Sequence, residues 1–492
     1  MTTMADHENG SPMAAGPHVV FLPFPLQGHV KPLFTLAQIL ADAQIHVTFV
    51  SSQNNYNSLL HLAESSAPAI RIIALQDGLP PSRPVRAGGS MNADLTEISF
   101  NVTRPLFREA LDSLFKDPSL PPPTCVVADI GMYFAVTVAA EFGIPGILFE
   151  ASCAIFSWLS CNIPKLLDNG IIPFKQESPD MDELVKCIPG FETLIRRRDL
   201  PDYLRVADEA FVKFFVAMWT VMKQEADSFI VNTSPVLEPE AIRQLGTVCR
   251  EVYAVGPFHS TGSNRVKKKS FAQGGLREGD NTCIQWLHSK PSKSVLYVSF
   301  GSVNNMAPQE ALEFWHGLMN SGSPFLWVIR TDLLTGQAGF DVSKIKEETG
   351  KESRGMIVEW CPQEEVLAHP AVGGFLSHCG WNSTIEAIVA GVPSIGWPQH
   401  IDQFLITRFV SQEWGVGIEM SEVVYDRVAI ERAVRELMEK RKDDIGQNVA
   451  RLSGLVRASI DAGGSAYNNL EKLIHDIKAM GGKCNSALLA SH

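Results

Sequence analysis

The chain has 492 residues, of which 45% are hydrophobic and 20% charged, a composition typical of a globular protein large enough for two domains. Its formal net charge of −12 argues against nucleic acid as a partner, because a surface that follows phosphates needs clustered Lys and Arg. No run approaches the ~18 apolar residues of a membrane helix, so we expect no integral membrane segment. The nine cysteines are irregularly spaced, which favours reduced thiols in a cytoplasmic protein over a disulfide framework.

Short β-branched or aromatic runs alternate with helical patterns through the first half of the chain. The predicted strands are His18–Phe24, Ile45–Ser51, Ile70–Leu75, Cys125–Ala128, Phe229–Asn232 and Val252–Val255. Helical periodicity separates them, for example at Pro32–Ala41, Leu95–Phe115 and Ile130–Phe142. This βαβ rhythm predicts a parallel, doubly wound sheet.

A second half with the same rhythm follows residues 259–281, which are rich in Gly, Ser, Asn and charge and predict a linker. Strands are expected at Ser294–Phe300, Phe325–Arg330, Met356–Val358, Gly373–Ser377, Ser394–Gly396 and Gly415–Glu419. Helices are expected at Pro308–Asn320, Arg427–Lys440, Asp444–Ser459 and Ala466–Lys478. The fold class is therefore α/β, with two Rossmann-like domains that face a cleft.

The expected organisation places a disordered tail before the first domain and a short tail after the last helix. Its segments are a tail at 1–16, a first domain at 17–258, the linker at 259–281, a second domain at 282–465, a terminal helix at 466–480 that packs back on the first domain, and a tail at 481–492. Ligands of open α/β sheets bind outside the carboxyl ends of the strands, so chemistry is expected just after them.

The segment from Trp360 to Gln403 holds the densest group of polar and aromatic residues. A strand ends at His378-Cys379-Gly380, and a helix begins at Trp381 or Asn382. A glycine turn that leads into a helix N-terminus is an anion site, because free N–H groups and the helix dipole face the ligand. The segment has no Lys or Arg, so neutral donors would hold the anion. The residues alone predict a phosphate-bearing ligand.

Structural alternatives exist for the same residues. Ser383 and Glu386 have the spacing of a capping box, and this interpretation is as good as a ligand role on spacing alone. Trp360 and Trp381 would equally suit a core. Asp402 and Gln403 would suit caps of the next helix.

His29 and Asp129 each follow a predicted strand of the first domain. Carboxyl ends of parallel strands lie on one edge of the sheet, so the two side chains can meet there. A His with a pKa near neutrality can remove the proton of a hydroxyl, and an Asp can fix its tautomer. The alternatives are an incidental exposed His and an Asp that caps a helix.

The Trp360–Gln403 segment closely resembles the signature box of plant family 1 uridine-diphosphate (UDP) glycosyltransferases. It shares the W-x-P-Q start, the H-C-G-W-N-S centre, the G-V-P turn and the D-Q end. Cys283–Ser302 and His18–His29 resemble two further landmarks of the family. The resemblance implies a fold of the GT-B type, with an acceptor-binding first domain and a UDP-sugar-binding second domain.

The resemblance also implies roles for single residues. Trp360 would stack on uracil and the backbone of Cys361 would read its edge, while Gln363 and Glu386 would bind the ribose. The pyrophosphate would be held by His378, Asn382, Ser383 and Ser302, and the sugar by Trp381, Asp402 and Gln403, with Gly28 also near the donor. His29 would be the base and Asp129 its partner. Acceptor-pocket residues would include Phe24, Phe149, Ser152 and His400.

By the same resemblance the reaction is a single displacement that inverts the anomeric carbon, with no metal and no cofactor besides the donor UDP-glucose. A final Gln, here Gln403, is associated with glucose. The acceptor would be a hydroxyl or carboxyl of a small hydrophobic plant-type metabolite, such as a flavonoid, phenolic, terpenoid or hormone, and we expect a monomer.

Four alternatives stay open at this point: another UDP-sugar, transfer to carbon or nitrogen, a non-catalytic binder of nucleotide sugars, and a Rossmann-type oxidoreductase. The last is disfavoured because no G-x-G-x-x-G opens a helix. A non-catalytic binder would be expected to lack His29 or Asp129.

Overall fold

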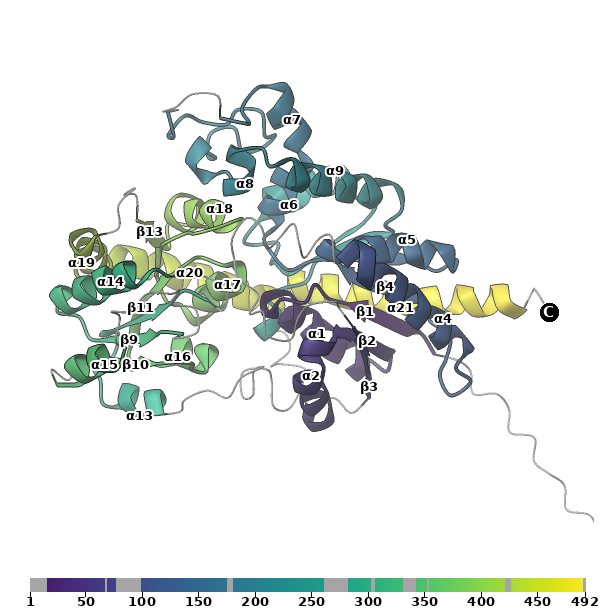
Figure 1. The fold of residues 1–492 in the computed structure, drawn as a ribbon, viewed down its shortest axis with the longest axis horizontal. Helices are drawn as coiled ribbons and strands as arrows, with labels where there is room; N and C mark the ends of the chain where they lie inside the picture. Colours follow the sequence, from purple (N-terminus) through teal and green to yellow (C-terminus); the bar gives the residue numbers. More distant parts are fainter. Residues whose placement is uncertain are drawn as a thin grey trace, which may run out of the picture.

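The computed structural model describes residues 16–66, 69–76, 99–174, 180–260, 282–301, 306–330, 342–351, 354–420 and 426–489 of the chain. Within these ranges the strands form two parallel sheets, one of seven strands in the order β3-β2-β1-β4-β5-β6-β7 and one of six in the order β10-β9-β8-β11-β12-β13. Figure 1 shows the two sheets beside one another, each with its own helices. The predicted fold class, two doubly wound Rossmann-like domains, is confirmed.

The first sheet is centred on β1. Its strands are β1 (His18–Leu22), β2 (His46–Ser52), β3 (Ile70–Leu75), β4 (Cys125–Asp129), β5 (Gly146–Glu150), β6 (Ser228–Val231) and β7 (Val252–Ala254). β1 pairs with β2 on one side and β4 on the other, so the strand order reverses direction there. A ligand of such a sheet binds at this switch point, and the residues after β1 and β4 line it.

The second sheet repeats this arrangement around β8. Its strands are β8 (Val295–Ser299), β9 (Phe325–Val328), β10 (Gly355–Val358), β11 (Val372–Ser377), β12 (Ser394–Gly396) and β13 (Gly417–Glu419). β8 pairs with β9 and with β11. The switch point therefore lies beside Gly301, after β8, and His378, after β11.

Helices surround both sheets. Those of the first half are α1 (Gln27–Asp42), α2 (Gln53–Ser66), α4 (Arg104–Lys116), α5 (Phe134–Glu141), α6 (Ala154–Cys161), α7 (Ile163–Asp168), α8 (Asp202–Arg205), α9 (Glu209–Gln224) and α10 (Pro239–Leu245). Those of the second half are α13 (Thr282–His288), α14 (Pro308–Ser321), α15 (Val342–Lys351), α16 (Gln363–Ala368), α17 (Trp381–Ala390), α18 (Gln403–Arg408), α19 (Arg427–Arg435), α20 (Lys442–Ile460) and α21 (Ser465–Leu489). Short 3-10 or π turns are η1 (Ser99–Thr103), η2 (Ile130–Met132), η3 (Arg197–Asp199), η5 (Phe409–Glu413) and η6 (Glu436–Lys440).

The last helix returns to the first domain. Figure 1 shows α21, in yellow, running along the first sheet. Its Leu470, Leu473 and Ile477 are fully buried in the same hydrophobic core as the strands β1 and β2, and Asp476 accepts a hydrogen bond from the Tyr253 hydroxyl of β7. The helix continues to Leu489, so a tail that begins at residue 481 was a wrong prediction.

Several predicted boundaries also differ from the structure. Strand β5 is absent from the sequence prediction because its five residues, GILFE, form a short apolar run that periodicity cannot assign. β1 ends at Leu22, which leaves Phe24 in the loop. The predicted start of a helix at Leu95 lies outside the described residues, and regular α4 begins at Arg104. Of the predicted linker, only residues 259 and 260 lie within the described ranges.

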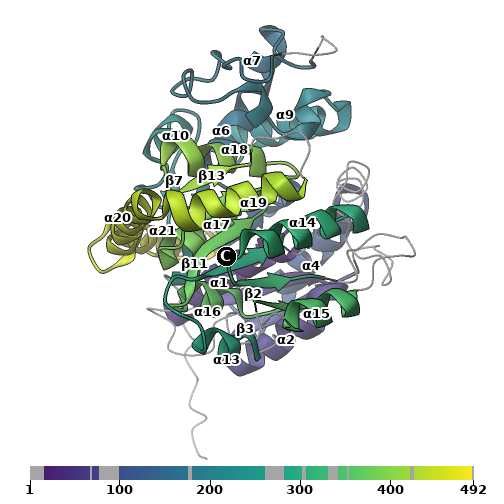
Figure 2. The same cartoon turned by 90° about the vertical axis from the view of Figure 1, so that its left-hand side faces the viewer.

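A helical segment from α6 to α9 lies against one end of the domain pair (Figure 2). It contacts the second domain through Arg196, whose guanidinium pairs with Asp199 beside it and with Glu419 of β13 at 2.9 Å. Among the described helices, none combines the length and the apolar character that crossing a bilayer requires.

Candidate active site

His29 and Asp129 form a hydrogen-bonded pair at the switch point of the first sheet. His29 lies in the first turn of α1 and Asp129 is the last residue of β4. The Nδ1 atom of His29 lies 2.8 Å from Oδ2 of Asp129. The other oxygen of Asp129 accepts the backbone N–H of Gly131 at 2.9 Å. Asp129 therefore caps η2 with one oxygen and orients the imidazole of His29 with the other.

The surroundings of His29 favour its protonated form. Burial alone would lower the pKa of His29, but the charge and the hydrogen bond of Asp129 outweigh it, with added contributions from Glu150 and Asp402, and raise the pKa above the usual value. The side chain is 30% exposed while Asp129 is fully buried. With Nδ1 facing a carboxylate, the neutral ring carries its proton there and presents the Nε2 lone pair elsewhere. The ring of Phe24 packs edge-on at 5.3 Å.

The position of Pro32 links the turn of His29 to the second domain. Pro32 lies inside α1, which begins at Gln27 and not at Pro32 as predicted. A proline has no N–H, so the carbonyl four residues earlier, that of Gly28, receives no helical hydrogen bond. Nδ2 of Asn382, in the first turn of α17, donates to this carbonyl at 2.8 Å. The Gly28 carbonyl is thus available because of Pro32.

The N-terminus of α17 is built from backbone groups and one histidine. Gly380 is the N-cap residue, with no side-chain cap, and Cys379 before it has a φ of 59°. A Cβ on Gly301 would lie 2.6 Å from Nε2 of His378, and one on Gly380 would also overlap this atom. The imidazole therefore fits only between two glycines. Burial lowers the pKa of His378 to about 4, so at neutral pH it is an uncharged donor.

The residues predicted to bind uridine and ribose share one hydrogen-bond network. Nε2 of Gln363 donates to Oγ of Ser383 at 3.0 Å and to Oε2 of Glu386 at 2.7 Å. The hydroxyl of Tyr297 donates to Oε1 of Gln363 at 3.1 Å and lies 3.4 Å from Sγ of Cys361. The capping-box interpretation of Ser383 and Glu386 was therefore wrong, because both side chains face α16 and not their own helix start.

Around this network, Cys361 is buried and Trp360 is partly exposed. Lys31 of α1 also contacts it, since its Nζ donates to Oε1 of Glu386 at 2.9 Å and to Oε1 of Glu364 at 2.6 Å. Ser302, predicted to contact the pyrophosphate, lies outside the described residues.

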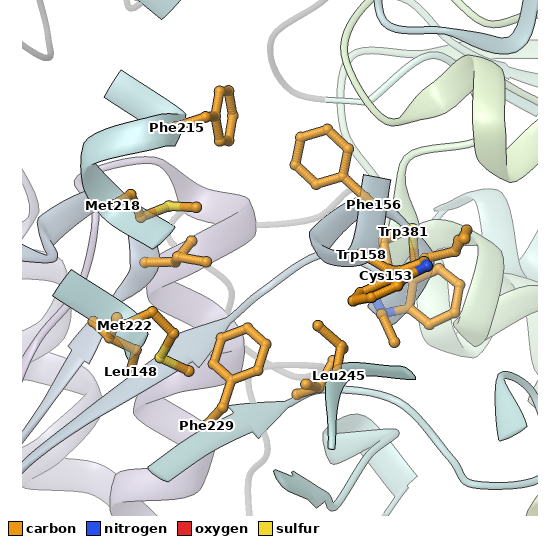
Figure 3. Close-up of a cluster of buried hydrophobic side chains, with 14 of the residues drawn as sticks. Leu148, Cys153, Phe156, Trp158, Phe215, Met218, Met222, Phe229, Leu245 and Trp381 are labelled. Atoms are coloured by element: carbon orange, nitrogen blue, oxygen red, sulfur yellow. The ribbon is translucent and has the colours of Figure 1, made fainter. Parts of the chain in front are cut away.

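Trp381 contacts the first domain through its indole. Its Nε1 donates to the carbonyl of Asn232 at 2.8 Å, and the ring is 3% exposed. Figure 3 shows it within the buried cluster that also holds Phe156 and Trp158. The ring of Trp381 is therefore part of the core, as the structural alternative predicted. The group of Trp381 that can contact a ligand at the helix start is its backbone N–H.

The loop before α18, which includes residues 399–402, is held by side chains of both domains. The hydroxyl of Ser152 donates to Oδ2 of Asp402. Oε1 of Gln403 accepts the backbone N–H groups of Gln399 at 2.8 Å and His400 at 3.2 Å, so Gln403 orders the loop, while Asp402 makes no side-chain cap. Asp202 accepts from the backbone N–H of Ile401 at 3.1 Å and lies 3.2 Å from Nδ1 of His400.

Glu150 orders the turn that carries Ser152. It ends β5, is 2% exposed, and accepts from Oγ of Ser157 at 2.6 Å and from the backbone N–H of Ser152 at 2.9 Å. Burial raises the pKa of Glu150 to about 7. Phe149 beside it points to the opposite face, where it is fully buried against Phe258. Phe149 therefore belongs to the core, and its prediction as a pocket residue was wrong.

Sequence reasoning missed three polar residues of this site: Lys31, Asp202 and Asn232. Asn232 is the last residue of a predicted strand, which was a usable signal. No local pattern marks the partners of Lys31 and Asp202, which come from more than 190 residues away. Within the described ranges, no group of His, Cys, Asp or Glu has the arrangement of a metal site.

Comparison with known proteins gives a consistent set of relatives. The family model described as UDP-glucoronosyl and UDP-glucosyl transferase matches residues 277–459. The chain is 40% identical to 7-deoxyloganetic acid glucosyltransferase of Catharanthus roseus, over 94% of this chain and 98% of that protein. It is 38% identical to myricetin 3-O-rhamnoside 1,2-glucosyltransferase of Crocosmia x crocosmiiflora, over 94% and 96% of the two chains. The solved structure of Medicago truncatula UGT71G1 complexed with UDP-glucose superposes with a TM-score of 0.75 at 26% identity, over 94% and 98% of the chains.

Proposed function

The chain belongs to the family of UDP-glucosyl and UDP-glucuronosyl transferases, and from this premise we propose that it transfers glucose from UDP-glucose to a hydroxyl of a small hydrophobic metabolite, with inversion. The observation that carries the proposal is the His29–Asp129 pair at 2.8 Å, in a turn whose Gly28 carbonyl is bound by Asn382 of the donor segment. Base and donor site are thereby held beside each other across the two domains.

His29 acts as the general base in this mechanism. Its Nε2 lone pair accepts the hydroxyl proton of the acceptor as the oxygen attacks the anomeric carbon. The bond from that carbon to the diphosphate oxygen breaks at the opposite side, which inverts the configuration, and UDP leaves with the electron pair. Asp129 stabilises the imidazolium that forms.

The second domain binds the leaving group. Backbone N–H groups at the start of α17 and the neutral His378 face the diphosphate, where they stabilise the charge that develops as the bond breaks. Asn382 and Ser383 lie on the same first turn, and we assign Ser302 there by resemblance. Glu386 and Gln363 are assigned to the ribose and Trp360 to uracil.

The sugar subsite is assigned to the loop before α18. Asp402 offers a carboxylate to the hydroxyls of glucose and is held by Ser152 of the first domain. Gln403 uses its carbonyl oxygen within the loop, so its amide N–H groups are the part that can contact sugar. Gln403 at this position, which the resemblance associates with glucose, supports UDP-glucose as the donor.

The acceptor site is assigned to the first domain, next to Phe24 and His29. Aromatic side chains of α6 and α9, among them Phe156 and Phe215, belong to the hydrophobic cluster drawn in Figure 3, and we place a hydrophobic acceptor against this part of the domain. The relatives named above are glucosyltransferases that act on small molecules, which supports the class of acceptor. A carboxyl acceptor, transfer to nitrogen or carbon, a monomeric state and a cytosolic location stay predictions.

A screen of the pure protein tests this function. UDP-glucose, UDP-galactose and UDP-glucuronic acid are each incubated with a library of flavonoids, terpenoids, hormones and phenols, and products are detected by mass spectrometry. We expect hexose adducts with UDP-glucose, a loss of about 10²- to 10⁴-fold in the His29→Ala variant, and activity that survives a chelator. Absence of any transfer by a folded protein that binds UDP would refute catalysis, and full dependence on a metal would refute the mechanism.

A further inference from the structure

We propose that Lys31 is a positioning residue for the donor, which keeps Glu386 ionised and oriented toward the ribose and so joins the helix of the base to the nucleotide site. This inference rests on the proposed function, because it takes Glu386 as the ribose carboxylate. Lys31 lies two residues after His29 in α1.

The geometry of the contact is well defined. Nζ of Lys31 lies 2.9 Å from Oε1 of Glu386 and 2.6 Å from Oε1 of Glu364. Lys31 is 25% exposed, Glu364 19% and Glu386 6%. Pairs this deeply placed are screened less by solvent than exposed ion pairs, which contribute little. Lys31 of the first domain thus contacts two acids of the second.

The lone pairs of Glu386 leave room for a diol. An ionised carboxylate has about four acceptor positions, two on each oxygen. Gln363 donates to Oε2 and Lys31 to Oε1, so the hydrogen bonds of the described residues leave one position on each oxygen. Two vicinal hydroxyls, as on the 2′ and 3′ carbons of ribose, match two acceptors on one carboxylate. Lys31 thus orients the carboxylate and still leaves acceptor positions for the ribose hydroxyls.

The charges around Glu386 show why the cation is needed. Glu364 of α16, Lys31 of α1, His259 and the hydroxyl of Tyr297 are the titratable groups that act on this cluster. Burial would raise the pKa of Glu386, but Lys31 first, and His259 and Gln363 after it, lower the pKa below its usual value. Without Lys31, the buried Glu386 would lose the main cation that opposes its burial while Glu364 remains nearby, and its pKa would rise.

A protonated Glu386 would bind ribose less well. The acid form has an O–H that must donate and fewer acceptor positions than the carboxylate, so one of the two hydroxyls loses its partner. The pKa of Glu386 would rise in the absence of Lys31, and donor binding would therefore weaken as the pH falls. This pH dependence separates positioning by Lys31 from a purely structural ion pair, whose loss would weaken binding equally at every pH.

The experiment compares Lys31→Met with Lys31→Arg, which keeps the charge, and with Lys116→Met, which breaks an exposed pair with Asp112 on α4. Binding of UDP and of 2′-deoxy-UDP is measured by calorimetry between pH 5.5 and 8.5, and the KM for UDP-glucose and kcat are measured alongside. For Lys31→Met we expect UDP to bind about tenfold more weakly at pH 6 and within about threefold of wild type at pH 8.5. We expect kcat to change less than KM.

The 2′-deoxy ligand tests whether the effect passes through the diol. In the wild type, removal of one hydroxyl should weaken binding by about tenfold. In Lys31→Met at pH 6, removal of the same hydroxyl should weaken binding by no more than about twofold, because the Glu386 carboxylate that binds this hydroxyl is already protonated. Lys31→Arg and Lys116→Met should keep the wild-type ratio and the wild-type pH profile.

A double variant covers the case in which Lys31→Met does not fold. Lys31→Met with Glu364→Gln removes one cation and one acid, which relieves the repulsion between the two acids but not the burial of Glu386, and we expect UDP binding that still weakens from pH 8.5 to pH 6, by less than in Lys31→Met. The proposal is refuted if the loss in Lys31→Met is the same at every pH, or if the preference for UDP over 2′-deoxy-UDP is unchanged. If the wild type itself does not bind UDP, the proposed function fails instead.

Discussion

Asp129→Asn is the sharpest test of the proposed base. The asparagine keeps an oxygen for the backbone N–H of Gly131, which Asp129 accepts at 2.9 Å, so η2 keeps its cap. The other oxygen, 2.8 Å from Nδ1 of His29, becomes an NH₂ group that donates. The imidazole must then accept at Nδ1 and carry its proton on Nε2, where it cannot take a proton from the acceptor.

The expected loss is about 10³-fold in kcat, which corresponds to about 4 kcal/mol of transition-state stabilisation. The KM for UDP-glucose should change less than about threefold, because Asp129 does not contact the donor segment. Stability should stay within about 1 kcal/mol of the wild type, since the cap is retained. Initial rates of glucoside formation by liquid chromatography and a thermal melt measure these quantities.

The pH profile adds a second readout. A base works only when neutral, so kcat/KM of the wild type should fall as the pH drops through the pKa of His29, which Asp129 raises above the usual value of about 6.5. In Asp129→Asn the burial of His29, which lowers its pKa, is opposed only by Glu150 and Asp402, so the acid limb should move to lower pH. A variant within tenfold of wild type, or an acid limb that does not move, would refute the reasoning. Asp112→Asn, at an exposed ion pair, serves as the control.

Two further substitutions test the donor subsites. Gln403→His should lower the preference for UDP-glucose over UDP-galactose by about tenfold in kcat/KM. Gln403 also orders the loop before α18 through the backbone N–H of Gln399. An equal loss of kcat/KM with both donors would therefore show that Gln403 acts only by ordering this loop. Gly380→Ala should raise the KM for UDP-glucose about tenfold, because the added Cβ overlaps the imidazole of His378 although the backbone conformation of Gly380 suits alanine. Gly454→Ala, where a Cβ meets nothing within 4 Å, should leave activity unchanged and stabilise α20 by about 0.5–1 kcal/mol. Similar KM values for the two glycine variants would contradict the fit of His378.

The sequence alone was enough for the architecture and for a set of candidate site residues. Alternating strand and helix patterns predicted two parallel sheets because periodic burial is a local property of each segment. His29, Asp129 and the segment from Trp360 to Gln403 were selected as candidates because ligand sites of such sheets follow the strands. Strand β5 was missed because a short apolar run has no periodicity of its own.

Tertiary structure decided which partner each polar group has. Lone pairs and N–H groups are shared among elements far apart in the chain, so spacing within one helix could not show that Glu386 faces Lys31 and Gln363 rather than Ser383. The same reason explains why the sequence could not show the partner of Trp381, whose indole N–H donates to the carbonyl of Asn232 in the first domain. A sequence pattern shows which face of a helix or strand is buried. The hydrogen-bond partners on that face depend on which residues of the other domain pack against it.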